Sequence, residues 1–180
     1  QIKTELKEND STIQRSTVPG FKNSNGANGI FISDSPENTL EGNQIGNNNF
    51  GIGINNSPGN ILTGNILLNN TYNLGISDDN NASGYLQNID TSNTVNGKPV
   101  YYLIGAYNLT IDGNSSPYSG GIGYLGLVSC TNITVKNISI SNNYQGILLA
   151  GSHNCLITGD QFTDNTVGIN MNYTTGNTVK

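Results

Sequence analysis

Short apolar segments recur along the chain at a fixed interval, and each places one outward residue between two apolar ones. The segment 29–32 (Gly-Ile-Phe-Ile) returns 22 residues later at 51–54 (Gly-Ile-Gly-Ile). Three later segments, which begin at Leu125, Ile147 and Ile169, keep the same spacing of 22. Alternation of this kind predicts short strands, and the interval is too short for a repeating pair of helices. The pattern therefore predicts a chain of repeated β units.

Each unit carries a further pair of apolar positions after a turn. These pairs are Leu40 with Ile45, Leu62 with Leu67, Val135 with Ile140, and Ile157 with Phe162. Three strands per unit of about 22 residues predict an all-β fold, a right-handed single-stranded parallel β-helix (solenoid). Because stacked coils lie about 4.8 Å apart, equivalent residues form columns along the axis. The predicted core columns are Ile30 over Ile52, Leu125 over Ile147 over Ile169, and Leu127 over Leu149 over Met171.

Two stretches depart from the repeat. Residues 1–24 hold scattered apolar positions and are predicted to form an irregular segment or a cap over the first coil. Residues 25–180 are predicted to form the β-helix, with a Gly- and Ser-rich loop insertion near 113–121. Counting back from Asn108 places Tyr101 and Leu103 in the columns of Leu125 and Leu127, so the coil is expected to continue through 77–122. An incomplete last coil and a first residue other than Met favour part of a longer chain.

Composition agrees with a stacked coil. The 180 residues include 32 Asn and 23 Gly, and 11% are charged, against about 25% in an ordinary soluble domain. Stacked Asn amides can form a hydrogen-bonded ladder at a corner, and Asn48 with Asn70, like Asn143 with Asn165, is spaced by 22. The alternative is that these Asn are solvated turn residues. A net charge of −5 gives no basic stripe for nucleic acid, and no apolar run is long enough to span a bilayer.

Catalytic chemistry is poorly supported by the residue types present. A glycosidase needs two carboxylates that face one groove, and a lyase needs an acidic calcium cluster with a basic residue. Asp160 and Asp164 share a coil, whereas Asp78 and Asp79 form the least unfavourable catalytic pair within a turn-like Asp-Asp-Asn-Asn run. The sequence therefore predicts no catalytic residue, no metal site and no cofactor, and the protein is expected not to be an enzyme.

The same register predicts the positions of the cysteines, the histidine and the glycosylation candidates. Cys130 aligns with Ser152 and Cys155 with Ile133, which puts the two Cα atoms about 10 Å apart and favours free thiols over a disulfide. A bend at the corner would leave a disulfide open. His153 is predicted to be a hydrogen-bonding or exposed turn residue. Among the Asn-x-Ser/Thr triplets, the predicted N-glycosylation candidates are Asn69, Asn81, Asn114 and Asn172.

Two segments resemble a known family. Asp-Thr-Ser-Asn-Thr-Val-Asn-Gly-Lys-Pro-Val-Tyr-Tyr at 90–102 and Gly-Tyr-Leu-Gly-Leu-Val-Ser-Cys-Thr-Asn-Ile-Thr-Val at 123–135, with 142–149 after it, are similar to NosD-like β-helix repeat proteins. These belong with the carbohydrate-binding and sugar-hydrolase (CASH) repeats and are abundant on methanogenic archaeal surfaces. The resemblance covers about 26–180 and implies an extracellular, cell-surface protein. The family name suggests copper delivery, but His153, Met171, Cys130 and Cys155 are spread over three coils, which disfavours a copper site.

Three functional hypotheses remain open from the sequence. The first is a non-catalytic scaffold in a cell-surface, sheath or adhesion assembly, which pairs with neighbouring copies or other surface proteins through its open solenoid ends. The second is a carbohydrate-binding β-helix in which exposed Tyr102, Tyr107 and Tyr118 contact a polysaccharide. The third is a polysaccharide lyase or hydrolase, which a groove with three or more close carboxylates would support.

Overall fold

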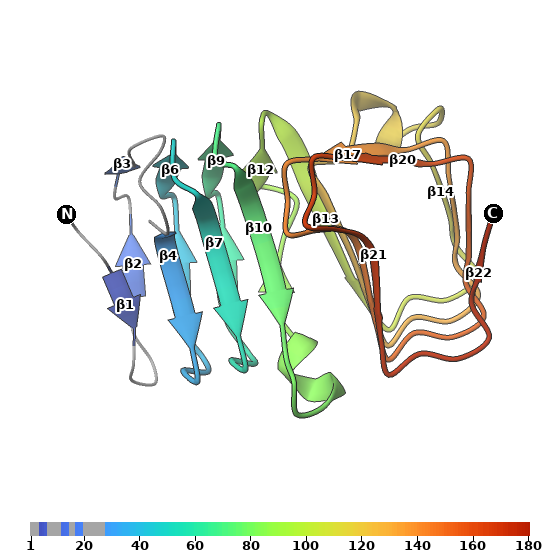
Figure 1. Ribbon diagram of the computed structural model, residues 1–180, viewed down its shortest axis with the longest axis horizontal. Coiled ribbons are helices and arrows are strands. Elements are labelled where there is room, and N and C mark those ends of the chain that lie inside the picture. The colour runs from blue at the N-terminus through green and yellow to red at the C-terminus, as the bar shows by residue number, and fades with distance from the viewer. Residues whose placement is uncertain (1–3, 7–11, 15–16, 20–27) are drawn as a thin grey trace.

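The chain folds into two stacks of parallel β coils that meet at an angle. The computed structural model describes residues 4–6, 12–14, 17–19 and 28–180. Within them lie 22 strands and two short 3-10 helices, η1 (Ala82–Tyr85) and η2 (Tyr118–Gly120). Figure 1 shows the first stack from the side and the second nearly along its axis, so one axis does not continue the other.

The first stack has three faces, and each face is a parallel ladder of four strands. The first face consists of β1 (Thr4–Leu6), β4 (Asn28–Ser33), β7 (Phe50–Asn55) and β10 (Tyr72–Ser77). The second consists of β2 (Thr12–Gln14), β5 (Thr39–Glu41), β8 (Ile61–Thr63) and β11 (Asn88–Ile89). The third consists of β3 (Thr17–Pro19), β6 (Gln44–Gly46), β9 (Ile66–Leu68) and β12 (Thr94–Val95).

The second stack repeats this plan with a shorter third face. Its first face consists of β13 (Lys98–Ile104), β15 (Tyr124–Val128), β18 (Gln145–Ala150) and β21 (Val167–Asn172). Its second face consists of β14 (Thr110–Asp112), β16 (Thr134–Lys136), β19 (Leu156–Thr158) and β22 (Thr178–Val179). Its third face consists of β17 (Ser139–Ser141) and β20 (Gln161–Thr163), and the predicted loop at 113–121 holds η2 in the preceding coil.

The predicted core columns are confirmed by the strand register. Ile30 pairs with Ile52, and Leu125 pairs with Ile147, which in turn pairs with Ile169. The prediction of an irregular segment or cap at 1–24 differs from the structure at the residues that it describes. There β1, β2 and β3 form a coil that pairs in parallel with β4, β5 and β6, and the remainder of that segment lies outside the described residues.

An antiparallel hairpin joins the two stacks. β12 pairs with β13 across Asn96 and Gly97, whose φ values are 50° and 78°. Asn-Gly suits a two-residue hairpin turn because both positions need a positive φ. The prediction that the coil continues through 77–122 is wrong at this turn, where the chain reverses direction. β13 still pairs with β15 in the predicted register, with Tyr101 opposite Leu125.

One sheet of the second stack is buried on both of its sides. The side that carries Leu125, Leu127, Ile147 and Leu149 faces the core of its own stack. The side that carries Tyr102, Tyr124, Val128, Leu148 and Ala150 joins the core of the first stack. Strands buried on both faces are almost continuously apolar, as β18 is. This sheet therefore covers the last coil of the first stack.

Side-chain amides complete the contact where β10 would otherwise present an unpaired edge. The Gln145 side chain donates to the Ile76 carbonyl (2.6 Å) and accepts from the Ile76 N–H (3.4 Å). It also accepts from the Tyr124 hydroxyl at 2.9 Å. Asn143 Oδ1 accepts from the Leu74 N–H at 3.2 Å. The edge of the first stack thus gains hydrogen-bond partners that a further coil would supply.

The predicted Asn ladders are present at the corners. Asn70 Oδ1 accepts from both the backbone N–H (2.9 Å) and the Nδ2 (3.0 Å) of Asn48. In the second stack, Asn165 Oδ1 accepts from the Asn143 N–H at 2.9 Å. Asn48, Asn70 and Asn143 are buried, so they are structural residues of the corner and not solvated turn residues.

Candidate functional site

Two of the three tyrosines expected on the surface are buried. Tyr102 is 8% exposed because it lies between the stacks, where its hydroxyl donates to the Tyr85 carbonyl at 2.6 Å. Burial raises the pKa of Tyr102 well above its usual value. Tyr118 is also 8% exposed, and its ring packs edge-on against Tyr101 at 5.0 Å. The exposure prediction is wrong for both residues and holds for Tyr107, which is 74% exposed.

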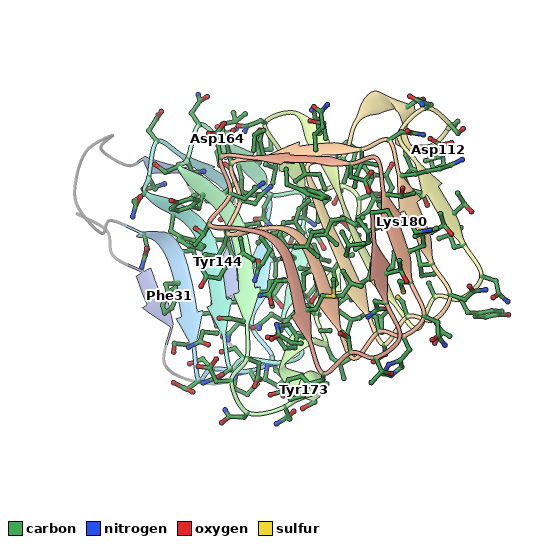
Figure 2. The ribbon with its side chains drawn as sticks, turned by 45° about the vertical axis from the view of Figure 1, so that its right-hand side comes forward. Phe31, Asp112, Tyr144, Asp164, Tyr173 and Lys180 are labelled. Atoms are coloured by element: carbon green, nitrogen blue, oxygen red, sulfur yellow. The ribbon has the colours of Figure 1, made fainter. Side chains whose placement is uncertain are left out.

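A different group of aromatic side chains lies on the outside of the first face. Phe31, Phe50 and Tyr72 come from β4, β7 and β10, and Tyr144 reaches them from the second stack; all four are half-buried. The Phe50 ring lies 6.0 Å from Tyr72 and 5.8 Å from Tyr144, tilted by 51° and 46°. Figure 2 labels Phe31 on the first stack and Tyr144 at its junction with the second. We call this group the aromatic face.

Glycines beneath the aromatic face let the rings lie close to the sheet. A Cβ at Gly53 would lie 2.6 Å from the Phe31 ring, and one at Gly75 would lie 2.7 Å from the Phe50 ring. Both distances are too short for a side chain, so the glycines make space for the rings. None of these four residues was predicted, because the predicted sugar-contacting residues were limited to the tyrosines of 101–124; Gly53 and Gly75 in the column of Phe31 were a visible signal.

At the far end of the second stack, core columns reach solvent. Met171 and Val179 are 39% and 48% exposed, whereas their column partners Leu149 and Ile157 are 0% and 1% exposed. The first face of the second stack and the third face of the first stack form one eight-stranded sheet through β13 and β12; β21 is its last strand, and β22 ends the second face. Tyr173, just after β21, is 49% exposed and is labelled in Figure 2. We call this surface, formed by β20, β21 and β22, the open end.

Asp78 and Asp79, the least unfavourable catalytic pair in the sequence, lie in a turn. Asp78 is 7% exposed, and its Oδ1 accepts from the backbone N–H groups of Asn80 (2.6 Å) and Asn81 (3.0 Å). Asp79 is exposed beside it. In the other pair, Asp164 is exposed, whereas one Asp160 carboxylate oxygen is buried. Among the residues that the structure describes, no three His, Cys, Asp or Glu side chains are grouped to hold a metal ion.

The cysteines and the histidine take local structural contacts. Cys130 and Cys155 are free, as predicted; both are buried, and burial raises the pKa of each thiol. The Cys130 N–H donates to Ser152 Oγ at 2.9 Å, in the predicted alignment. His153 Nδ1 lies 2.9 Å from Thr175 Oγ1 of the next coil. His153 is therefore a hydrogen-bonded turn residue.

The predicted glycosylation candidates differ in the exposure of their side chains and in the hydrogen bonds that these side chains form. Asn69, Asn81 and Asn114 are exposed, and Asn172 is half-buried. Asn81 Oδ1 accepts from the Ser83 N–H at 2.9 Å at the start of η1, and Asn172 Nδ2 donates to Asn170 Oδ1 at 2.8 Å. Glycan attachment at these four residues stays a prediction.

Comparison with known proteins identifies one match. The model of a family described as the right handed beta helix region matches residues 4–180. No curated protein and no solved structure matches the chain. The family match agrees with the stacked coils and with their predicted right-handed sense. In the described part of the chain, no helix is long and apolar enough to cross a membrane.

Proposed function

The chain belongs to the right-handed β-helix family, and from this premise we propose that it is a non-catalytic extracellular module, a structural element of a cell-surface, sheath or adhesion assembly. The open end is the observation that carries this proposal. Met171 and Val179 continue core columns and yet stay exposed there. The resemblance of 90–102, 123–135 and 142–149 to NosD-like surface proteins supports the extracellular setting.

The chemistry of the open end defines the partner that would fit it. A partner must add a strand to β21, because a strand edge offers unpaired backbone donors and acceptors. It must also cover Met171 and Val179 with apolar side chains. Within this chain the equivalent end of the first stack is covered by an apolar sheet side with amide side chains, and this contact supports the same chemistry for a partner at the open end. We propose that a second copy of the chain provides the strand.

Self-association measured by sedimentation velocity over a range of concentrations tests this proposal. The wild type is expected to form dimers or longer species, and the double variant Met171→Lys, Val179→Lys is expected to stay monomeric because it charges the open end. Ile66→Lys is the matched control, since Ile66 is 36% exposed on the side of the first stack. A wild type that remains monomeric throughout, or association that Ile66→Lys abolishes instead, contradicts pairing through the open end.

Carbohydrate binding is the second candidate, and the aromatic face favours it. Half-buried rings over glycines present a shallow apolar surface, and sugar rings pack their C–H groups on aromatic side chains. Ser33, Asn55 and Ser77 form the neighbouring column of polar residues, in which Ser77 Oγ donates to Asn55 Oδ1 at 3.1 Å. Under this hypothesis these side chains exchange hydrogen bonds with sugar hydroxyls.

A glycan array with three variants tests the carbohydrate hypothesis. Phe31→Ala and Tyr72→Ala should each abolish binding of any neutral polysaccharide that the wild type retains. Tyr107→Ala removes the most exposed predicted tyrosine, far along the sequence from the aromatic face, and should leave binding unchanged. Wild-type protein that binds no glycan, or binding lost only in Tyr107→Ala, would count against the aromatic face.

A further inference from the structure

One corner of each stack, between the second and third faces, follows a fixed hydrogen-bond pattern. In the first stack, Asn65 Oδ1 accepts from the Asn43 N–H one coil earlier at 3.1 Å. Asn65 Nδ2 donates to the carbonyl of Leu40, 25 residues earlier, at 2.8 Å. The amide therefore accepts with one atom and donates with the other, and both partners belong to the preceding coil.

Asp160 occupies the same position in the second stack, but it has a carboxyl group in place of the amide. Gly159 precedes it with φ 69°, as Gly64 precedes Asn65 with φ 65°. Asp160 Oδ1 accepts from the Ile138 N–H at 2.9 Å, which reproduces the first half of the pattern. By the same register, Oδ2 takes the place of Nδ2, and the carbonyl that corresponds to Leu40 is that of Val135, 25 residues before Asp160.

The second half of the pattern fails when Asp160 is ionised. Among the residues described, Asp160 Oδ2 is the buried side-chain oxygen or nitrogen that has no hydrogen-bond partner. A carboxylate has no proton to donate to a carbonyl, and a buried polar atom left unpaired destabilises the fold. A protonated carboxyl would instead supply the O–H that replaces the amide N–H of Asn65.

Charged neighbours do not replace that proton. Lys136, next to the corner on β16, pairs with Asp112 at 3.2 Å. Asp164 and Lys180, at the ends of β20 and β22, are both exposed. Burial raises the pKa of Asp160, against hydrogen bonds from the backbone at Ile138 and Thr158 that lower it. The shift has the sign that a buried carboxyl without a partnering cation should have.

We propose that Asp160 is a pH-sensitive ladder residue: its protonated carboxyl donates from Oδ2 to the Val135 carbonyl and ties the corner before β20 to the coil beneath, and its ionisation releases that bond. A group whose folded-state pKa is raised contributes stability that is complete below its unfolded pKa and is lost as pH rises through the folded value. This corner belongs to the coil that ends in β20, at the open end. Mild acid therefore strengthens the open end.

Asp160→Asn supplies the amide permanently and is the direct test. Hydrogen exchange is followed by mass spectrometry over 134–141 and 156–163 on the 180-residue chain, at a dilution that keeps it monomeric, from about pH 4 to about pH 8. After correction for intrinsic exchange, wild-type protection should fall by about tenfold across this range, the effect of one hydrogen bond. Asp160→Asn should keep its protection, and Asp164→Asn should follow the wild type.

Asp160→Ala separates the charge from the hydrogen bonds. It should remove the pH dependence but leave protection low at every pH, because Ile138 loses its acceptor as well. Equal pH dependence in the wild type and Asp160→Asn would overturn the proposal, as would a wild-type carboxyl that titrates below the ordinary range. Because the measurement uses the monomer, it succeeds or fails independently of self-association.

Discussion

Within the described residues, the last coils of the two stacks have different neighbours, although both stacks are built from the same coil. The last coil of the first stack meets an apolar sheet side that carries Tyr124 and Leu148, and Gln145 hydrogen-bonds to its strand edge. The last coil of the second stack has no such cover in the described structure, and Met171 and Val179 stay exposed. Coils bury their cores only against neighbours, so an end surface is decided by what lies beyond it.

The difference between the covered coil and the open end is visible in paired residues of β18 and β21. Leu148 pairs with Asn170, so an apolar residue between the stacks gives way to a polar one in the next strand. In the opposite sense, the polar Gln145, which hydrogen-bonds to the first stack, pairs with the apolar Val167 in that strand. The side chains change where the contact with the first stack ends, while the backbone register continues. The fold of a coil and the role of its outer surface are therefore encoded by different positions.

Leu148→Ala should give the largest difference between covered and open positions. Leu148 is 0% exposed between the stacks, so its truncation is expected to lower the free energy of unfolding by about 2–5 kcal/mol. Asn170→Ala, in the same column at the open end, should cost about 0.5 kcal/mol or less. Urea denaturation measures both values. Equal losses would mean that the sheet does not cover the first stack.

Gln145→Leu should have the next largest effect. It leaves the Ile76 N–H and carbonyl and the Tyr124 hydroxyl without their partner, at a cost of about 2–3 kcal/mol in the free energy of unfolding. Gln161→Leu makes the same substitution at an exposed position on β20 and is expected to be nearly neutral. Thermal unfolding compares the two variants, and a neutral Gln145→Leu would rule out the side-chain cover.

Asn70→Ala and Asn165→Ala compare one ladder position between the stacks. Asn70 is 3% exposed and Asn165 is half-buried at the open end, and each accepts from the coil before it and donates to a carbonyl there. The expected losses in the free energy of unfolding are about 2 kcal/mol for Asn70 and about 1 kcal/mol for Asn165, since unpaired groups near solvent regain water. The reverse order, measured in urea, would contradict this account of the ladder.

Asp112→Asn should have the smallest effect, confined to acid. Hydrogen bonds from Asn137 and the Asn114 N–H, with Lys136 nearby, lower the pKa of Asp112 to about 2. A lowered folded pKa gives stability that is present above the unfolded pKa of about 3.9 and lost as pH falls through the folded value. Wild-type Tm should therefore approach that of Asp112→Asn as pH falls, which differential scanning calorimetry would show. A Tm gap that widens in acid would contradict it.

The coil could be predicted from the sequence because its signals are local and repeated. Ile30 and Ile52 lie on one column because 22 residues make one turn of the coil, and Asn48 and Asn70 follow the same rule. The reversal between the stacks occurs at one dipeptide, Asn96-Gly97, inside a segment that otherwise keeps the register. Counting repeats predicts that Tyr101 pairs with Leu125, but it does not detect that the chain reverses direction before β13.

The candidate surfaces were less predictable because the exposure of their residues depends on how the two stacks contact each other. Tyr102 occupies an outward position of its own coil, and the first stack then covers it. Tyr144 comes near Phe50 only because the second stack reaches back along β10. The apolar run of β18 was the available signal for burial on both sides, since an outward-facing strand would alternate.

Because the hairpin at Asn96 and Gly97 separates the two stacks, each stack can change in length without the other. A unit of 22 residues inserted before β10 would lengthen one arm by a single coil spacing of about 4.8 Å, and one inserted after β18 would lengthen the other. Neither insertion touches the residues that fix the angle, which lie in β10, in the hairpin and in β13 to β18. Duplication of repeats can thus change reach in fixed steps while the corner keeps its geometry.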